Sequence, residues 1–319
     1  MAASKTKSFI RARLKTRQIA LLVHLDDERS VLRAAEVAGM TQPAASKILR
    51  ELEEALEVPL FERHARGVVP TWYGEILVRH ARSILSELSH AQDEISALKS
   101  GRSGQASIGT VLSPGTDLIP MAIGLLKQGN PEMQITVDLN HSTALIEKLL
   151  QGDLDMVVGR ILDAQGAEEL QFEPLADERH ALIAGAQHPL AGRRNLHLED
   201  LTDQSWILPT TGSVLRNSLV ARFLARGLPV PGNVVETSSM PVITSLLRTT
   251  NMVVVLPETA VQSYCQAGLL TVLIKDVGVD IGLFGIVTRR RFKLSPGAQV
   301  LLAALREAAS RLYPAAPTE

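Results

Sequence analysis

Apolar side chains recur at three- and four-residue spacings between residues 14 and 60, a pattern typical of short amphipathic helices. The spacing predicts one helix over about 15–25 and a second over 31–37. Gly39 follows the second helix, where a residue with positive φ can end it. We expect Thr41 to cap a third helix with its side-chain oxygen. Pro43 falls in the first turn of that helix, where a missing N–H has no cost.

The third helix has two chemically distinct faces. Its apolar positions, Ile48, Leu49, Leu52 and Leu56, form one stripe that faces a core. The outer face carries Thr41, Gln42, Pro43, Ala44, Ser46, Lys47 and Arg50. Short polar, amide and basic groups at the start of a helix are what the DNA major groove accepts. The pattern therefore predicts a helix-turn-helix, followed by a small β wing over 61–70 in which Arg63, His64 and Arg66 reach phosphates or the minor groove.

A long helix is predicted over about 72–99, with Thr71 as its cap. Its apolar positions are spaced alternately by four and three residues, and they are Leu77, Ala81, Ile84, Leu88, Ala91, Ile95 and Leu98. Three heptads without a break are typical of a coiled-coil seam. The alternative is an amphipathic helix that lies on its own domain. Because the local sequence offers no further core, we expect the helix to dimerise the protein.

Beyond a glycine- and serine-rich hinge, the pattern becomes α/β. Candidate strands are 106–111, 134–140, 155–159, 172–175, 181–184, 206–208, 234–237, 253–256 and 283–288, and candidate helices are 118–128, 142–151, 214–226, 241–249, 258–267 and 296–313. The alternation predicts a mostly parallel sheet with helices on both faces. The chain is expected to cross between two subdomains near 159–160 and to return near 257–268.

Charge is unevenly distributed along the 319 residues. Residues 1–82 carry 14 basic and 10 acidic side chains, a net charge of +4, whereas the remainder carries 19 basic and 24 acidic side chains, a net charge of −5. A basic N-terminal part fits nucleic-acid binding, although a solvated tail would show the same bias. The single cysteine, Cys265, excludes an intrachain disulfide and is expected to pack as a small hydrophobe. No apolar run is long enough for a membrane span and no signal peptide is recognisable, so we expect a cytoplasmic protein.

Four hydroxyl-rich loops lie where strands of an open α/β sheet end and helices begin, which is where such sheets bind ligands. The candidate effector-binding residues in these loops are Ser113, Pro114 and Thr116, then Ser142, then Thr210, Thr211 and Ser213, and finally Ser238 and Ser239. Each loop alone is equally explained by helix capping. Together they favour a site for a small polar or carboxylate-bearing molecule. Arg160 is either the charge partner of that ligand or part of an interdomain salt bridge.

Enzymatic and metal-binding motifs are absent from the sequence, which lacks a P-loop, a G-x-G-x-x-G, an H-E-x-x-H and a G-x-S-x-G. The histidines have no metal-ligand spacing. We therefore expect no catalytic residues, metal or cofactor. Two other interpretations stay open: an enzyme or solute-binding module with an accessory DNA-binding domain, and an architectural DNA protein, which would not need about two hundred residues of α/β domain.

Several short strings in the first 75 residues closely resemble the LysR-type transcriptional regulators. In order they are R-A-A (33–35), T-Q-P-A-A-S-K (41–47), L-E-E (52–54), V-P-L-F-E-R (58–63) and T-x-x-G (71–74). Length and domain order agree too, and the chain is most similar to the galactose-binding-protein regulator branch. The resemblance implies a winged helix-turn-helix with a basic arm (1–71), a dimerisation helix (72–99), a hinge (100–105) and an effector domain (106–319) of type 2 periplasmic-binding-protein fold. Lobe I is expected over about 106–159 and 268–319, and lobe II over about 160–267.

The same resemblance implies a regulator that is not an enzyme, and that binds double-stranded promoter DNA as a dimer or tetramer. RNA polymerase is a further candidate partner. The DNA-binding residues are expected to be Arg33, Thr41, Gln42, Pro43, Ser46, Lys47, Arg50, Arg63 and Arg66. Lys47 stands where the family often has arginine, and lysine lacks the planar fork that grips guanine with two hydrogen bonds. Its base-specific role is therefore in doubt.

Overall fold

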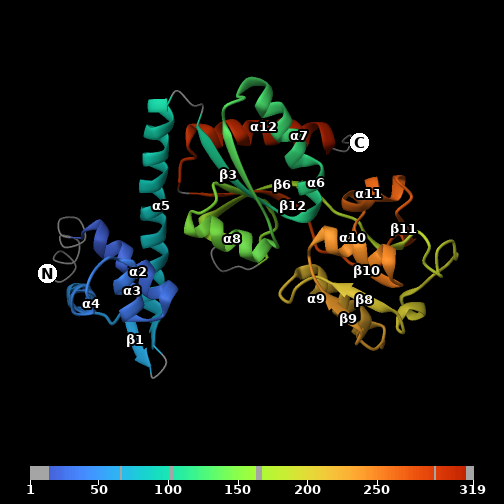
Figure 1. Cartoon of the computed structure of the whole chain (residues 1–319), viewed down its shortest axis with the longest axis horizontal. Coiled ribbons are helices and arrows are strands. Elements are labelled where there is room, and N and C mark those ends of the chain that lie inside the picture. The colour runs from blue at the N-terminus through green and yellow to red at the C-terminus, as the bar shows by residue number, and fades with distance from the viewer. Residues whose placement is uncertain (1–13, 65–66, 101–103, 163–166, 291, 314–319) are drawn as a thin grey trace. The chain divides into compact units, whose positions relative to one another are not determined.

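The computed structural model describes residues 14–64, 67–100, 104–162, 167–290 and 292–313 (Figure 1). The chain divides into two compact units: residues 1–101 with Leu150–Asp153 form the first, and the remainder forms the second. No helix among the described residues has the length and apolar character needed to cross a membrane.

Within its described residues, the N-terminal unit contains four helices and a two-stranded wing. Its elements are α2 (Thr16–Glu28), α3 (Val31–Val37), α4 (Gln42–Leu56), β1 (Phe61–His64), β2 (Gly67–Pro70) and α5 (Trp72–Ser100). The core gathers the apolar stripes of these helices, including Leu21, Leu25, Ala34, Leu52 and Leu60, all almost fully buried. The helices and the wing thus lie where the hydrophobic pattern predicts them, and α2 extends three residues further than expected.

The turn between α3 and α4 forms as predicted in one respect and differs in another. Gly39 adopts φ +61° and so closes α3 in the left-handed region. Thr41 occupies the N-cap position of α4, but its side chain makes no capping hydrogen bond, so the expected cap is wrong. The turn is instead held by Arg17, whose Nη2 donates to the carbonyl oxygen of Gly39 at 3.0 Å.

Residues of the L-E-E, V-P-L-F-E-R and T-x-x-G strings bond to one another around the end of α4. The Glu53 carboxylate accepts hydrogen bonds from the backbone N–H groups of Leu60 (2.8 Å) and Phe61 (3.2 Å). The Thr71 hydroxyl caps α5 by accepting from the N–H of Gly74 at 3.1 Å, as predicted. A Cβ at Gly74 would lie 2.0 Å from the Leu60 carbonyl oxygen, so only glycine fits there. These contacts fix the wing and the start of α5 to the end of α4.

The second unit is built from two lobes, each with a five-stranded sheet. The sheet of lobe I has the order β4-β3-β5-β12-β6. Its elements are β3 (Gln105–Thr110), α6 (Leu112–Thr116), α7 (Leu118–Gly129), β4 (Gln134–Leu139), α8 (Ser142–Gln151), β5 (Met156–Gly159), β6 (Leu170–Ala176), β12 (Phe284–Arg289) and α12 (Pro296–Leu312). Helices α7 and α12 pack their apolar faces into one core with the sheet.

The sheet of lobe II has the order β11-β7-β10-β8-β9. Its elements are β7 (His180–Gly185), β8 (Ser205–Leu208), α9 (Val214–Ala225), β9 (Val234–Glu236), α10 (Met240–Thr249), β10 (Met252–Pro257), α11 (Glu258–Gln266) and β11 (Leu270–Ile274), and short 3₁₀ turns occur at Ala167–Glu169 and Leu198–Leu201. The two faces of this sheet carry separate cores, around Trp206 and Phe223 on one side and Ile243 and Leu247 on the other. Cys265 packs against the second core, as expected of a small hydrophobe.

Strand pairing corrects the predicted sheet and the predicted lobe boundaries. Both sheets are mixed rather than mostly parallel, because β12 is antiparallel to β5 and β6, and β7 is antiparallel to β10 and β11. Strand β6 belongs to the sheet of lobe I, so the first crossing follows Ala176 instead of lying near 159–160. Strand β11, which the pattern did not predict, stays in lobe II, so the return lies between Ile274 and Phe284 rather than near 257–268. The reason is that β6 and β11 are held by partners distant in sequence.

Candidate DNA interface and effector site

The helix α4 presents the face that the sequence predicted for DNA. Thr41, Gln42, Pro43, Lys47 and Arg50 are exposed, and Ser46 is half-buried. The opposite face, with Ala45, Leu49 and Leu52, is buried in the core. The Lys47 ammonium lies 3.9 Å from the Glu51 carboxylate one turn away, a surface pair that leaves it able to reach a phosphate.

The remaining predicted DNA-binding residues are distributed around that helix. Arg33 is exposed on α3, and its Nη1 lies 3.3 Å from the Glu36 carboxylate. Arg63 is exposed on β1. Arg66 lies outside the described residues. Arg17 is not among the predicted DNA-binding residues, but its contact with Gly39 makes it a positioning residue for the start of α4.

Helix α5 lies on its own unit at its start and leaves its later apolar positions exposed. Its first turns, including Val78 and Ala81, pack into the core of the N-terminal unit. Further along, Ile84, Leu88 and Ile95 are 43%, 50% and 54% exposed. The apolar seam is therefore covered at its start and uncovered over its later heptads. Leu98 lies where side chains fall outside the described residues.

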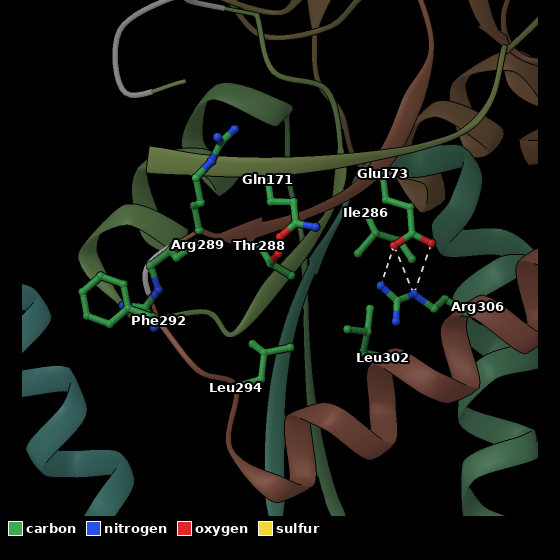
Figure 2. Close-up of a pocket in the computed structure, with 10 residues that line it drawn as sticks. Gln171, Glu173, Ile286, Thr288, Arg289, Phe292, Leu294, Leu302 and Arg306 are labelled. Carbon is green, nitrogen blue, oxygen red and sulfur yellow. Dashed lines mark hydrogen bonds and ion pairs between the residues drawn. The ribbon is translucent and has the colours of Figure 1, made fainter. Parts of the chain in front are cut away.

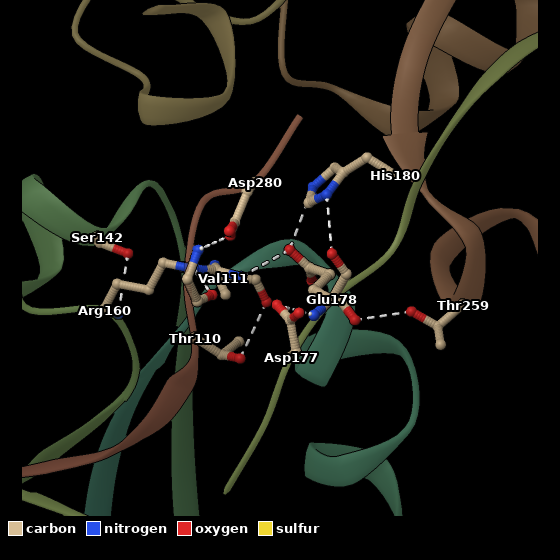
Figure 3. Close-up of polar contacts among 11 residues, drawn as sticks. Thr110, Val111, Ser142, Arg160, Asp177, Glu178, His180, Thr259 and Asp280 are labelled. Carbon is tan, nitrogen blue, oxygen red and sulfur yellow. Dashed lines mark hydrogen bonds and ion pairs between the residues drawn. The ribbon is translucent and has the colours of Figure 1, made fainter. Parts of the chain in front are cut away.

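Where the two lobes meet, two of the predicted effector residues, Ser142 and Arg160, lie in one buried polar cluster (Figure 3). The Ser142 hydroxyl accepts from the backbone N–H of Arg160 at 3.1 Å. The Arg160 guanidinium is 5% exposed; its Nε donates to the Gly282 carbonyl at 3.0 Å and its Nη2 to Glu178 Oε2 at 2.9 Å. Glu178 lies in the crossing between β6 and β7. Of the two roles left open for Arg160, the structure shows the salt bridge.

Glu178 is the electrostatic centre of this cluster. Its Oε2 lies 3.2 Å from His180 Nε2, and its side chain is 5% exposed. Burial acts to raise the pKa of Glu178, but the hydrogen bond from His180 and the charge of Arg160 outweigh it and lower the pKa below its ordinary value. Its other oxygen, Oε1, is buried and has no hydrogen-bond partner. The carboxylate is thus ionised and can still accept a hydrogen bond.

Ser113 links the two lobes directly. Its hydroxyl oxygen lies 2.7 Å from that of Thr259, so a hydrogen bond joins α6 of lobe I to α11 of lobe II. Pro114 beside it is buried, whereas Thr116 is exposed and donates back to the Ser113 carbonyl. Sequence reasoning missed Thr259, Glu178 and His180. Glu178 and His180 alternate at the start of the buried strand β7, and this pattern could have indicated those two residues.

The predicted loops of lobe II form a second group. Thr211 donates its backbone N–H to Glu236 at 2.9 Å, and Arg216 bridges Thr211 and Glu236. Ser213 and Ser239 occupy N-cap positions, but neither side chain makes a capping bond. Thr210, Ser238 and Ser239 are exposed. Among the described residues, no hydrogen bond joins these loops to the Arg160 cluster, so the four predicted loops form two groups rather than one.

The buried side chain of His188 has structural partners. The His188 ring contacts the Asn251 carbonyl and accepts from the Leu190 N–H, both at 3.1 Å. No group of three or more potential ligands among the described residues could hold a metal ion.

Comparison with known proteins agrees with this arrangement. Residues 16–75 match the family of bacterial regulatory helix-turn-helix proteins of the lysR family, and residues 99–310 match the LysR substrate binding domain. The chain is 39% identical over 301 residues to the HTH-type transcriptional regulator GbpR of Azospirillum brasilense, covering 94% of this chain and 88% of that one.

Solved structures of full-length regulators show the same fold. A full-length OxyR variant from Pseudomonas aeruginosa is similar with a TM-score of 0.59 and 26% identity, covering 95% of this chain and 96% of that one. CbnR in a complex with its target DNA gives a TM-score of 0.58 at 17% identity, covering 92% of this chain and all of that one. With the helix-turn-helix, the two-lobed domain and these matches, the chain belongs to the LysR family of DNA-binding transcriptional regulators, which are not enzymes.

Proposed function

We propose that this regulator binds a specific promoter site through the exposed face of α4. Gln42, Pro43 and Ser46 face the base edges in the major groove, and Thr41 accompanies them at the start of the helix. A second group holds phosphates or groove walls, and it comprises Arg33, Lys47, Arg50, Arg63 and Arg66. The observation that carries the proposal is the exposure of this polar and basic face on a helix whose opposite face is buried.

The uncovered heptads of α5 support a dimer. Ile84, Leu88 and Ile95 repeat at coiled-coil spacing and leave apolar surface that a second α5 would cover. A dimer places two α4 helices on the half-sites of a pseudo-palindrome. We infer further that two such dimers assemble into a tetramer on DNA, where RNA polymerase is a candidate partner.

The effector is a small polar or carboxylate-bearing metabolite. We assign its contacts to the residues at the junction of the lobes, Ser113, Pro114, Thr116, Ser142 and Arg160, and to the hydroxyl loops of lobe II, Thr210, Thr211, Ser213, Ser238 and Ser239. The support is that Ser113 and Arg160 both bond to groups beyond lobe I, to Thr259 and to Glu178. A ligand that binds one arrangement of the lobes better than another shifts the population towards it, and only by that difference in affinity.

DNase footprinting on the region upstream of the protein's own gene tests the proposal. We expect a protected stretch longer than one dimer covers, with a hypersensitive site between two segments. Gln42→Ala should cost about 1–3 kcal/mol at that site and little on random DNA. Arg311→Gln, at an exposed ion pair on the C-terminal helix α12 of the second unit, is the control. Equal losses on both DNAs would refute base reading by Gln42.

A further inference from the structure

Lobe I holds a cavity of about 170 Å³ where β6 and β12 face α12 (Figure 2). The antiparallel register pairs Gln171 with Thr288 and Glu173 with Ile286. Directly paired residues point to the same face of a sheet, so these four side chains form one wall. Helix α12 and the segment that precedes it form the opposite wall. The cavity lies within one lobe, and none of the residues in the Arg160 cluster lines it.

The walls of the cavity combine apolar and polar groups. Ile286, Leu294 and Leu302 supply aliphatic surface. Phe292 adds an aromatic ring, and the guanidinium of Arg289 lies 4.5 Å from its centroid, in cation–π range. The amide of Gln171 and the hydroxyl of Thr288 also line the space. Such a lining suits a ligand with a short apolar body and one polar head.

The charged groups are unequal in number, since the cavity is lined by three arginines and one carboxylate. Arg306 binds that carboxylate through two nitrogen atoms. Its Nε donates to both oxygens of Glu173, at 3.1 and 3.0 Å, and its Nη2 donates to Oε2 at 2.7 Å. The protein's own side chain thus occupies a position that a ligand carboxylate could take, because guanidinium and carboxylate match in geometry.

Because Arg306 is paired with Glu173, the excess positive charge comes from Arg289 and Arg290. The Nε and Nη2 of Arg290 donate to the Leu170 carbonyl at 3.3 and 3.2 Å, which fixes the plane of the guanidinium. Within the described part of the chain, no carboxylate lies in ion-pair range of Arg290, and its side chain is exposed. An oriented guanidinium that bonds only to a backbone carbonyl keeps the capacity to bind an anion.

We propose that lobe I carries a second ligand site, for a small carboxylate with a short apolar body. Arg306 binds the carboxylate by releasing Glu173, while Ile286, Leu294 and Leu302 cover the apolar body, and Arg290 adds positive charge near the end of β12. The site is independent of the effector contacts proposed at the junction of the lobes. Its ligand ties α12 to the strands β6 and β12 and so stabilises lobe I.

Titration calorimetry on the full-length protein tests the site, with butyrate and benzoate as probes and inorganic phosphate as a third anion, at constant ionic strength. We expect saturable binding of at least one carboxylate. Arg306→Gln should weaken it at least tenfold, since the charge-assisted hydrogen bonds of the guanidinium to the carboxylate are lost. Glu173→Gln should tighten it, because Arg306 then has no internal carboxylate to release. Arg311→Gln, on the same helix but outside the cavity, should leave the affinity unchanged.

The variant Glu173→Gln distinguishes a ligand site from general destabilisation, which would only weaken binding. The proposal is overturned if neither carboxylate binds, if phosphate binds as tightly as both carboxylates, or if Arg311→Gln weakens binding as much as Arg306→Gln. Loss of binding in Ser113→Ala would also overturn it, because the probe would then occupy the junction of the lobes.

Discussion

Replacing Arg160 with methionine should destabilise the second unit in a strongly pH-dependent manner. Methionine fills similar volume but leaves the buried Glu178 carboxylate without its Nη2 partner at 2.9 Å. An unpaired charge that is 5% exposed must either stay ionised at a high desolvation cost or take up a proton. Whichever of these two states of Glu178 has the lower free energy determines how much unfolding free energy the variant loses.

Protonation sets an upper limit that can be calculated. From the ordinary glutamate pKa of 4.5, protonating Glu178 at pH 7 costs about 3.4 kcal/mol, at 1.36 kcal/mol per pH unit. At pH 5 the same step costs about 0.7 kcal/mol. The loss of unfolding free energy should therefore be as large as about 3 kcal/mol at pH 7 and should shrink by up to about 2.7 kcal/mol at pH 5.

In the unaltered protein the dependence has the opposite sign. The pKa of Glu178 is lowered on folding, so its contribution to stability is present above about pH 4.5 and is lost as the pH falls through the folded-state pKa. Between pH 5 and 7 that contribution is constant. The difference between variant and parent therefore isolates the unpaired carboxylate.

Urea unfolding followed by tryptophan fluorescence measures this difference. Trp206 is fully buried in lobe II, whereas the only other tryptophan, Trp72, is 68% exposed and can be replaced by phenylalanine in the background. Arg306→Met, which breaks an exposed pair with Glu173, is the control and should cost no more than about 1 kcal/mol with little pH dependence. An equal destabilisation by Arg160→Met at pH 5 and pH 7 would refute the reasoning.

Further changes test the remaining assignments. Ser113→Ala and Thr211→Val should abolish the effector response in a DNA-binding assay while leaving DNA affinity intact, and an unchanged response in both would remove these loops from the effector site. Leu88→Asp should shift the protein towards monomer in analytical ultracentrifugation, because it puts a charge into the α5 seam; an unchanged sedimentation coefficient would exclude this seam. Glu53→Ala should cost the N-terminal unit about 1–3 kcal/mol in chemical denaturation, since two backbone N–H groups lose their acceptor, and Glu54→Ala, at an exposed position, is its control. Gly74→Ala should lower the melting temperature, because its Cβ would overlap the Leu60 carbonyl; an unchanged value would contradict that packing.

The sequence by itself determined the elements of the N-terminal unit of this protein. The stripe of Leu49 and Leu52, the turn at Gly39 and the cap at Thr71 are signals that act over a few residues, and each element they predict is present. Helix periodicity and turn chemistry are local properties, so they can be recognised without knowing the rest of the fold. The exposed face of α4 followed directly from the same periodicity. The side-chain cap expected from Thr41 does not form, and the turn carries a contact that the local pattern does not encode, from Arg17 to Gly39, 22 residues away.

Only the tertiary structure decided the sheets, the lobe boundaries and the polar cluster between the lobes. Strands β6 and β11 gain their places from partners distant along the chain, which a local pattern does not encode. The hydrogen bond between Ser113 and Thr259 spans 146 positions, and that between Arg160 and Gly282 spans 122. Sequence reasoning could name Ser113, Ser142 and Arg160, because they end strands or begin helices, but not Glu178 or Thr259. The roles of Glu178 and Thr259 depend on which chain segments meet when the chain crosses twice between the lobes. The packing of the cores of both lobes decides this, rather than any local preference.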